Sequence, residues 1–435
     1  MKNSKLLAGF VIVLALACGA GAFLMTACSD TSTTSQEEVA PPEPEPITNP
    51  LTGATAEQGY DESIIDEQRI VAFVVENSPD ARPQWGMDDE QYPPDIVLEG
   101  EVEGGITRTL WFYADFNKLP EQIGPMRSAR PPFIRFSECF DAIFIHWGQS
   151  HSKGDYVGAS TVFKDDVVDH INQMSFSNEC GLYDRDHSRG VSAEHTGIVY
   201  GDKVKAAIDE YGCRKHPETP TELLFNETAE PMSDILANEI NLDFSDRTNW
   251  ETKHWTYNEE DQMYHTDAFK NDFKRDNLLV LFDDTEYITK ANYEGPGSTG
   301  SVTYCDYALG GGEGKLFSLG TVKNIEWQID SDKKLYLIDA DATKAARDAA
   351  EAKAAEEGLT EEEIKAAGDA AEVVYAGLNP GRTWIGWASQ NNGGELEIIP
   401  NEPKEEAAEG EGADGEGADA AEDSGDSAEG AEETE

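Results

Sequence analysis

The amino-terminal segment decides how much of this 435-residue chain is available to fold in water. Lys2 and Lys5 precede an apolar run over residues 6–24, and Cys28 follows a small residue. A basic start, an apolar core and a small residue before cysteine are typical of an export signal whose cysteine is lipidated. We therefore predict a lipoprotein signal peptide over residues 1–28, with lipidation at Cys28.

An uncleaved membrane anchor is the alternative interpretation of the same segment. The apolar run approaches the roughly 18 to 20 residues that span a bilayer, but the small residues 19–22 are typical of a cleavage region. Cys18 is a second lipidation candidate, although it lies inside the apolar run, whereas Cys28 precedes a polar segment. Both interpretations place the protein on the outer face of the cytoplasmic membrane, with the membrane itself as a partner.

The charge of the chain excludes one class of partner. Its 33 Lys and Arg residues stand against 86 Asp and Glu residues, which gives a formal net charge of -53. So strongly negative a chain is repelled by the phosphate backbone of nucleic acids. We predict no nucleic-acid partner, and nothing in the sequence indicates a cofactor.

Four cysteines remain beyond the signal segment, and they are Cys139, Cys180, Cys213 and Cys305. An even number of cysteines in an oxidising compartment predicts two disulfides, and the spacing leaves three pairings open. No CxxC pair occurs among them, and no pair of histidines has the HExxH spacing. We therefore predict no metal site.

Three segments are set apart by composition. Residues 29–46 are rich in Ser, Thr, Glu and Pro, which predicts an extended linker. Residues 401–435 are almost wholly Glu, Asp, Ala and Gly, and cannot bury a core, so we expect a disordered acidic tail. Ala, Glu and Lys dominate residues 341–371, which favours an exposed helical hairpin with Thr360 and Glu363 as a capping box.

The remaining chain is long enough for two domains. We place an amino-terminal α/β domain at residues 47–230 and a smaller β-rich domain, which contains the helical insertion, at residues 231–400. Short apolar runs predict buried strands in the first part, at residues 69–76, 95–98, 108–114 and 142–147. Alternating apolar and polar residues predict mostly antiparallel strands in the second part. The fold class is therefore α+β.

The candidate site is a set of arginines near predicted strand ends. The set, with the acids and the histidine beside it, comprises Arg108, Arg127, Arg130, Arg185, Asp186, Arg189, Glu99, Glu103 and His146. Because arginine offers planar, paired donors, such a set predicts a pocket for a carboxylate or a phosphate. Internal pairing of the arginines with Glu99, Glu103 and Asp186 explains the pattern equally well. Prolines limit any helix at Arg127 and Arg130 to about one turn, on which both would share a face.

A catalytic interpretation has little support from motifs. His146 or His195 is a candidate general base for Ser128 as nucleophile, with Asp186 orienting the base. Glu103 or His195 is the candidate base of a hydrolase in which the arginines hold the substrate. No Gly-x-Ser-x-Gly sequence surrounds Ser128, however, as a nucleophile elbow requires.

Several motifs in order resemble the YerB-like family of bacterial lipoproteins. They lie at residues 49–53, 77–86, 95–99, 102–108, 123–131 and 183–189, and in the carboxy-terminal part at 254–257 and 378–384. The resemblance implies an extracytoplasmic lipoprotein with an α/β domain followed by a β-rich domain, and it implies no activity. Residues 147–151 and 193–196 depart from the pattern of the family.

The sequence thus predicts a membrane-anchored binding or accessory lipoprotein with an arginine-rich cleft for an anionic envelope ligand. Peptidoglycan carboxylates and the phosphates of wall polymers both fit the charge and the compartment. An envelope hydrolase that uses Glu103 or His195, and a scaffold for envelope proteins that uses the hairpin and the tail, are the alternatives.

Overall fold

The computed structural model describes residues 48–55, 68–218, 222–248, 251–293 and 300–400. The predicted signal peptide with Cys28, the linker and the acidic tail lie outside these residues, as does a helix expected at residues 61–67. No helix in the described part of the chain is both long and apolar enough to cross a membrane.

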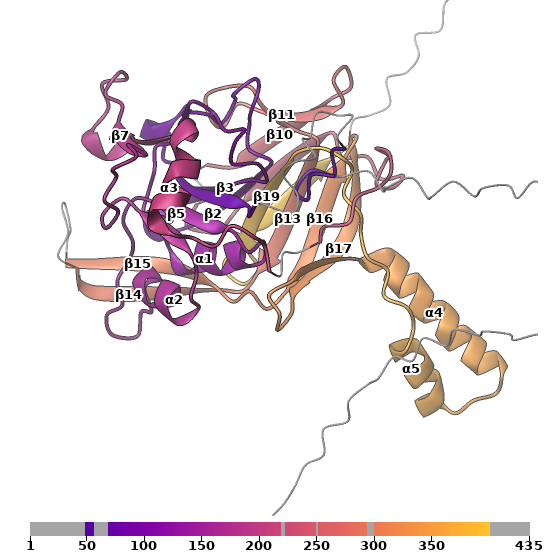
Figure 1. Ribbon diagram of the computed structural model, residues 1–435. Helices are drawn as coiled ribbons and strands as arrows, with labels where there is room; N and C mark the ends of the chain where they lie inside the picture. Colours follow the sequence, from indigo (N-terminus) through magenta and orange to yellow (C-terminus); the bar gives the residue numbers. More distant parts are fainter. Residues whose placement is uncertain (1–47, 56–67, 219–221, 249–250, 294–299, 401–435) are drawn as a thin grey trace, which may run out of the picture. The chain divides into compact units, whose positions relative to one another are not determined.

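A mixed sheet dominates the described residues, with the strand order β18-β17-β16-β13-β19-β2-β3-β1-β5-β6 (Figure 1). Its amino-terminal strands are β1 Val71–Glu76, β2 Ile96–Glu101, β3 Thr107–Tyr113, β5 Ile143–His146 and β6 His170–Asn172. Its carboxy-terminal strands are β13 Asn277–Asp283, β16 Gly312–Ser318, β17 Thr321–Ile329, β18 Leu335–Asp339 and β19 Thr383–Ser389. The strands predicted from apolar runs are therefore confirmed, with small shifts at their ends.

Strand β1 shows why continuous apolar runs mark this sheet. All six of its residues are buried, and successive side chains enter two different cores. Ala72 and Val74 belong to one apolar cluster, whereas Phe73 and Val75 belong to the other. Because side chains alternate between the faces of a strand, a strand covered on both faces needs apolar residues at every position.

The two predicted domains share this one sheet. Strand β19, from the second part of the chain, pairs in parallel with β13 on one side and with β2 of the first part on the other. Strands β13, β16, β17 and β18 are joined by antiparallel pairs. The α+β class is confirmed, while the division at residue 230 stays a prediction.

Smaller sheets complete the β structure. One has the order β12-β11-β10-β9-β20 and consists of β9 Glu239–Asp243, β10 Lys253–Asn258, β11 Met263–Thr266, β12 Phe273–Arg275 and β20 Glu395–Ile399. Strands β14 Thr285–Tyr293 and β15 Gly300–Tyr307 form a two-stranded ribbon. Strands β4 Gln122–Ile123, β8 Gly197–Tyr200 and β7 Tyr183–Arg185 form a three-stranded sheet. This last sheet carries the loops of the candidate site.

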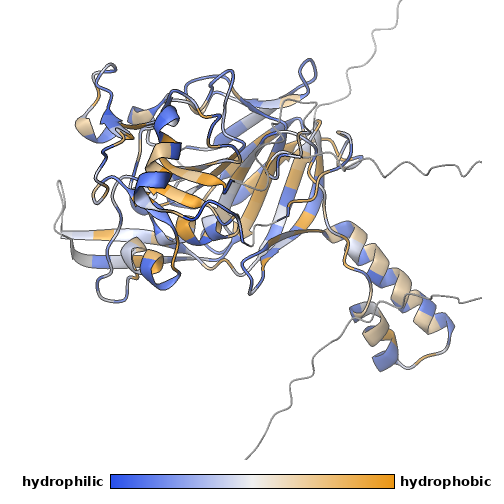
Figure 2. Ribbon diagram, in the orientation of Figure 1, coloured by the Kyte–Doolittle hydropathy of each residue, from blue (hydrophilic) through white to orange (hydrophobic). Residues whose placement is uncertain are grey.

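The helices are α1 Pro131–Glu138, α2 Ala159–Asp165, α3 Val204–Tyr211, α4 Ala340–Glu356 and α5 Glu361–Asp369. Helices α4 and α5 form the predicted hairpin, and Thr360 and Glu363 make the predicted capping box at the start of α5. Figure 2 shows blue residues alternating with pale ones along both helices, in contrast to the orange strands of the main sheet. Ala354 is the buried residue of α4, so the hairpin contributes little apolar surface to a core.

The prediction of two disulfides is corrected, because none of the four cysteines in the described residues forms one. Cys139 and Cys305 lie in one apolar cluster and Cys213 in the other. Burial raises the pKa of the Cys139 and Cys213 thiols to about 12. These side chains therefore stay protonated and pack as small apolar groups.

Candidate functional site

The segment that follows β4 carries Arg127 and Arg130 past the ends of β1 and β5 in an extended conformation. The Arg127 amide donates to the Val74 carbonyl at 2.9 Å, and the Trp147 amide donates to the Arg127 carbonyl at 3.0 Å. Arg130 has φ -128° and ψ 146°, and α1 begins only at Pro131. Residues three apart on an extended chain point to opposite sides. The predicted helical turn is therefore wrong, and the two arginines do not share a face.

Arg130 and Arg108 are held by one carboxylate. Arg130 Nε donates to Glu103 Oε2 at 2.7 Å and its Nη2 pairs with Oε1, while Arg108 Nη2 lies 3.4 Å from the same Oε1. Arg108 Nη1 also donates to the Ser128 carbonyl at 2.6 Å. We call these three side chains the Glu103 cluster.

Glu103 stays ionised because Arg108 and Arg130 lie beside its carboxylate. Burial alone would raise the pKa of Glu103, but Arg130 and Arg108 outweigh it and hold that pKa well below its usual range. Burial lowers the pKa of Arg108 to about 10, against the attraction of Glu103. Glu103 therefore stays ionised near neutral pH and is poorly suited to accept a proton there.

Arg127 belongs to a different group of side chains. Its Nη2 lies 2.9 Å from Glu76 Oε1, and the other oxygen of Glu76 lies 2.8 Å from His195 Nδ1. Glu76 is buried, whereas the Arg127 side chain is 26% exposed. Glu194 Oε2 lies 3.8 Å from Arg127 on the exposed side. The sequence analysis missed Glu76, which lies at the end of a buried strand without a motif.

Arg185 is the last residue of β7 and Arg189 lies in the loop after it, but the two side chains contact different residues. Arg185 lies 4.5 Å above the ring of Trp147, and its Nη1 donates to the Ala193 carbonyl and, at 3.2 Å, to Thr196 Oγ1. Arg189 lies 3.5 Å above the ring of Trp85 and donates to backbone carbonyls. Asp186 is half-exposed, and its carboxylate accepts the Ser188 amide at 2.7 Å. Asp186 pairs with neither arginine among the described ion pairs.

A cavity of about 600 Å³ opens where these loops meet. It is lined by Met126, Arg127, Ser128, Trp147, Gly148, Gln149, His151, Asn172, Met174, Ser175, Arg185, Glu194 and Gly197. We call it the arginine cleft. Its lining contains Arg127 and Arg185 but not the other predicted arginines, so the structure gathers two of the five. Most of the lining side chains are polar, and Met126, Trp147 and Met174 supply the apolar part of the wall.

Glu99 lies apart from the arginine cleft in a buried network. Its Oε1 accepts from Asn77 and from Thr107 at 2.8 Å and lies 3.1 Å from Lys253 Nζ, and its Oε2 accepts from Trp384 at 3.2 Å. Glu99 and Lys253 each have side chains 1% exposed. Burial lowers the pKa of Lys253, and Glu99 opposes the change. The sequence analysis missed Lys253, which lies more than 150 positions away with no motif to link it to Glu99.

His146 is buried and does not reach the arginine cleft. Its Nδ1 lies 2.6 Å from the Gly148 carbonyl and its Nε2 lies 3.0 Å from His170 Nδ1. Burial, with His170 beside it, lowers the pKa of His146 to about 3. This histidine is therefore neutral and supports the core. The described residues contain no group of three His, Cys, Asp or Glu side chains that could hold a metal ion.

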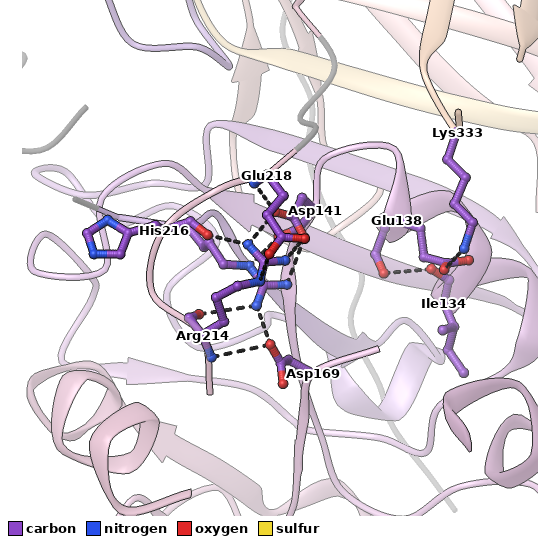
Figure 3. Close-up of polar contacts among 10 residues, drawn as sticks. Ile134, Glu138, Asp141, Asp169, Arg214, His216, Glu218 and Lys333 are labelled. Atoms are coloured by element: carbon purple, nitrogen blue, oxygen red, sulfur yellow. Dashed lines mark hydrogen bonds and ion pairs between the residues drawn. The ribbon is translucent and has the colours of Figure 1, made fainter. Parts of the chain in front are cut away.

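A further arginine cluster, which the sequence analysis did not single out, lies near the start of β6 (Figure 3). Arg214 contacts both oxygens of Asp141, at 2.6 and 2.9 Å, and its amide lies 3.3 Å from Asp169 Oδ2. Arg69 pairs with Asp141 at 3.0 Å and with Asp169. These four side chains neutralise one another. These contacts hold Arg214 against Arg69, which precedes β1, and against Asp169, which precedes β6.

Comparisons with known proteins bear on the same residues. A family model described as "Protein of unknown function (DUF3048) N-terminal domain" matches residues 51–214. The protein named "Putative lipoprotein YerB" from Bacillus subtilis (strain 168) is 29% identical over 242 residues, or 56% of this chain and 64% of that protein. A crystal structure of YerB protein from Bacillus subtilis matches with a TM-score of 0.56 and 23% identity, over 81% of this chain and 99% of that one.

The predicted resemblance to the YerB-like family is confirmed. The YerB match spans 64% of the length of that relative, and the structural match, at 23% identity, shows the fold alone. The matched family domain, residues 51–214, contains every residue that lines the arginine cleft and all of the Glu103 cluster. Its description assigns no function to them.

Proposed function

We propose that this chain is a lipid-anchored, extracytoplasmic binding protein that holds an anionic envelope ligand in the arginine cleft. The lipid anchor is supported by the predicted signal with Cys28 and by the printed name of the Bacillus subtilis relative. The binding role is carried by one observation: Arg127 and Arg185 line a cavity of about 600 Å³ in a chain of net charge -53.

The donors left on Arg185 favour an anion. A guanidinium group has five N–H donors, and the side-chain contacts of Arg185 within the described residues use Nη1 alone. Stacking on Trp147 fixes the plane of the Arg185 group, which lowers the entropy that a bound ligand would have to remove. Carboxylates and phosphates match such a planar donor set.

Glu194 at the rim of the arginine cleft does not prevent binding. Its side chain is 61% exposed and its carboxylate lies 3.8 Å from Arg127. Exposed pairs of this kind contribute only about 0 to 1 kcal/mol. A ligand anion is therefore able to replace Glu194 beside Arg127 at little cost, whereas the buried Glu76 keeps Arg127 in position.

The hydrolase alternative receives less support from Glu103 than from His195. Glu103 is ion-paired with two arginines, whereas His195 has one ring nitrogen oriented by Glu76. His195 does not line the arginine cleft, and its Nε2 lies 3.8 Å from Glu194. The scaffold alternative rests on the exposed hairpin of α4 and α5. Deleting residues 343–371 would abolish partner binding if the scaffold alternative holds.

Calorimetric titration of the full chain in detergent tests the proposal. The probes are a soluble muropeptide, which offers carboxylates, and poly(glycerol phosphate), which offers phosphates. We expect one of them to bind and Arg185→Gln to weaken it at least tenfold. Arg135→Gln is the matched control, because Arg135 is a partly exposed arginine paired with Asp306 outside the arginine cleft. If neither probe binds, or if both variants bind like the wild type, the proposed function fails.

A further inference from the structure

A second cavity, of about 360 Å³, lies at one end of the central strands and shares no lining residue with the arginine cleft. Asp95 and Arg382 immediately precede β2 and β19, which are parallel neighbours, and Tyr113 ends β3, which is antiparallel to β2. Strand direction therefore brings these three side chains to one edge of the sheet. Asn49, Tyr92 and Asp115 are among the other lining residues.

Arg382 is unusual among the arginines of this chain. Within the described residues, each of the other arginines has a hydrogen bond or an ion pair from its guanidinium group, but Arg382 has neither. Its backbone is anchored, because the Arg382 amide donates to Asp276 Oδ2 at 2.7 Å. Among the described residues, the guanidinium group of Arg382 thus has no such partner at the wall of a cavity, although the chain contains 86 Asp and Glu residues.

Tyr113 supplies a second polar group without a partner. The residue is 2% exposed, yet its hydroxyl makes no hydrogen bond within the described residues. Tyr113 lines the cavity together with Asp95 and Arg382. A buried hydroxyl without a partner destabilises the folded protein, because it has lost its hydrogen bonds to water. A ligand that bonds to it would offset that loss.

The acidic groups of the cavity have partners but retain accepting capacity. Asp95 accepts from the Ala114 amide at 2.8 Å and from Asn49 Nδ2 at 3.4 Å. Asp115 accepts from the Asn117 amide at 2.8 Å and lies 3.9 Å from Lys118 Nζ. A carboxylate has about four acceptor positions. Asp95 therefore has room for a donor on a ligand.

We propose that this cavity binds a small zwitterion of the amino-acid type. The ligand carboxylate bonds to Arg382 and to the Tyr113 hydroxyl, and the ligand ammonium group lies against Asp95. The ionisable groups that line the cavity include two carboxylates, Asp95 and Asp115, and two cations, Lys118 and Arg382. A zwitterion leaves this balance unchanged, whereas a simple anion or cation would not.

Titration calorimetry on the full chain in detergent tests the inference. The probes are glycine, L-alanine and D-alanine, with acetate and methylammonium as half-ligands and N-acetylglucosamine as a neutral polar ligand. We expect at least one amino acid to bind, and each half-ligand and the sugar to bind at least tenfold more weakly. Absence of binding by all three amino acids overturns the inference, as does equal or tighter binding of acetate, methylammonium or N-acetylglucosamine.

Two variants locate the binding. Arg382→Gln should weaken the amino acid at least tenfold. Tyr113→Phe should also weaken it without lowering the unfolding temperature of the free protein, because the hydroxyl that it removes has no hydrogen-bond partner in the described part of the chain. Arg185→Gln, in the arginine cleft, is the control and should bind the amino acid like the wild type. Binding that survives Arg382→Gln unchanged, or that is lost in Arg185→Gln, contradicts the inference.

Discussion

The Glu103 cluster and the arginine cleft use the same residue type in opposite ways. In the Glu103 cluster, Arg108 and Arg130 share one carboxylate and have side chains 4% and 11% exposed. In the arginine cleft, Arg185 stacks on an aromatic ring and is exposed. The five arginines that look like one site in the sequence therefore divide into two that hold the fold, two that line a cavity and one, Arg189, that binds backbone carbonyls.

The difference follows from the strands that carry the residues. Arg108 lies inside β3 and is surrounded by the sheet, so its charge needs an internal partner. Arg185 ends a short edge strand beside a loop, where solvent and ligands have access. Arg108 and Arg130 should therefore affect stability, whereas Arg185 should affect binding.

The largest expected effect is on stability, from Glu103→Gln. Removing this carboxylate leaves Arg130 and Arg108 without their shared counter-charge. Breaking such a pair costs about 3 kcal/mol. Chemical denaturation should therefore show a lower free energy of unfolding than for the wild type. If this variant instead keeps its stability and loses a measurable activity, the hydrolase alternative is favoured and the structural role of Glu103 is contradicted.

The free energies of unfolding of the wild type and of Glu103→Gln should depend differently on pH. The pKa of Glu103 is lowered from 4.5 in the fold, so ionised Glu103 contributes its full stability above pH 4.5 and loses it as the pH falls toward the lower folded pKa. The stability gap between wild type and Glu103→Gln should be constant from about pH 5 to 8. Below pH 4.5 it should shrink by about 1.4 kcal/mol per pH unit. If this difference in stability grows as the pH falls, ionised Glu103 does not stabilise the fold, and the prediction is wrong.

Arg185→Gln should change ligand affinity and leave the fold intact. Its side chain gives up hydrogen bonds to Ala193 and Thr196 at an exposed site, so the unfolding temperature should change little. Hydrogen bonds to charged groups contribute about 1.5 to 3 kcal/mol, which corresponds to a loss of affinity of roughly tenfold or more. Thermal unfolding of one portion of the sample measures the unfolding temperature, and titration of another portion measures the ligand affinity. A large drop in unfolding temperature would assign Arg185 to the structural group.

The smallest effect is expected from Arg135→Gln. Arg135 lies on α1, five positions after Arg130, and pairs with Asp306 at 3.4 Å with a side chain 33% exposed. Exposed pairs contribute at most about 1 kcal/mol. Denaturation of this variant should therefore resemble that of the wild type, and ligand binding should be unchanged. A loss close to that of Glu103→Gln would remove the distinction between buried and exposed pairs.

The sheet was predictable from the sequence because both of its faces are covered. The apolar run of β1 marked its strand directly. The alternation of β17, and of β10 in the five-stranded sheet, marked strands with one less-buried face. The hairpin of α4 and α5 was equally clear, since its composition and its capping box are local signals.

Most of the charge partners were not predictable, because the pairs depend on contacts between distant strands. Internal pairing of Arg130 with Glu103 was one of the two open interpretations. Glu99 with Lys253 and Glu76 with Arg127, however, meet only once the sheet has formed. The helical turn at Arg127 and Arg130 was wrong for a related reason: backbone bonds to Val74 and Trp147 hold that segment extended. The cysteines likewise gave a disulfide prediction from their number, whereas their burial decides their state.

The most direct test of the division between paired and cleft arginines compares Arg130→Gln with Arg185→Gln in one titration series. Both variants and the wild type are titrated with the probe that the wild type binds, well below their unfolding temperatures. The account predicts that Arg130→Gln unfolds at a lower temperature but binds like the wild type, and that Arg185→Gln unfolds like the wild type but binds at least tenfold more weakly. Normal binding by Arg185→Gln together with lost binding by folded Arg130→Gln would contradict it.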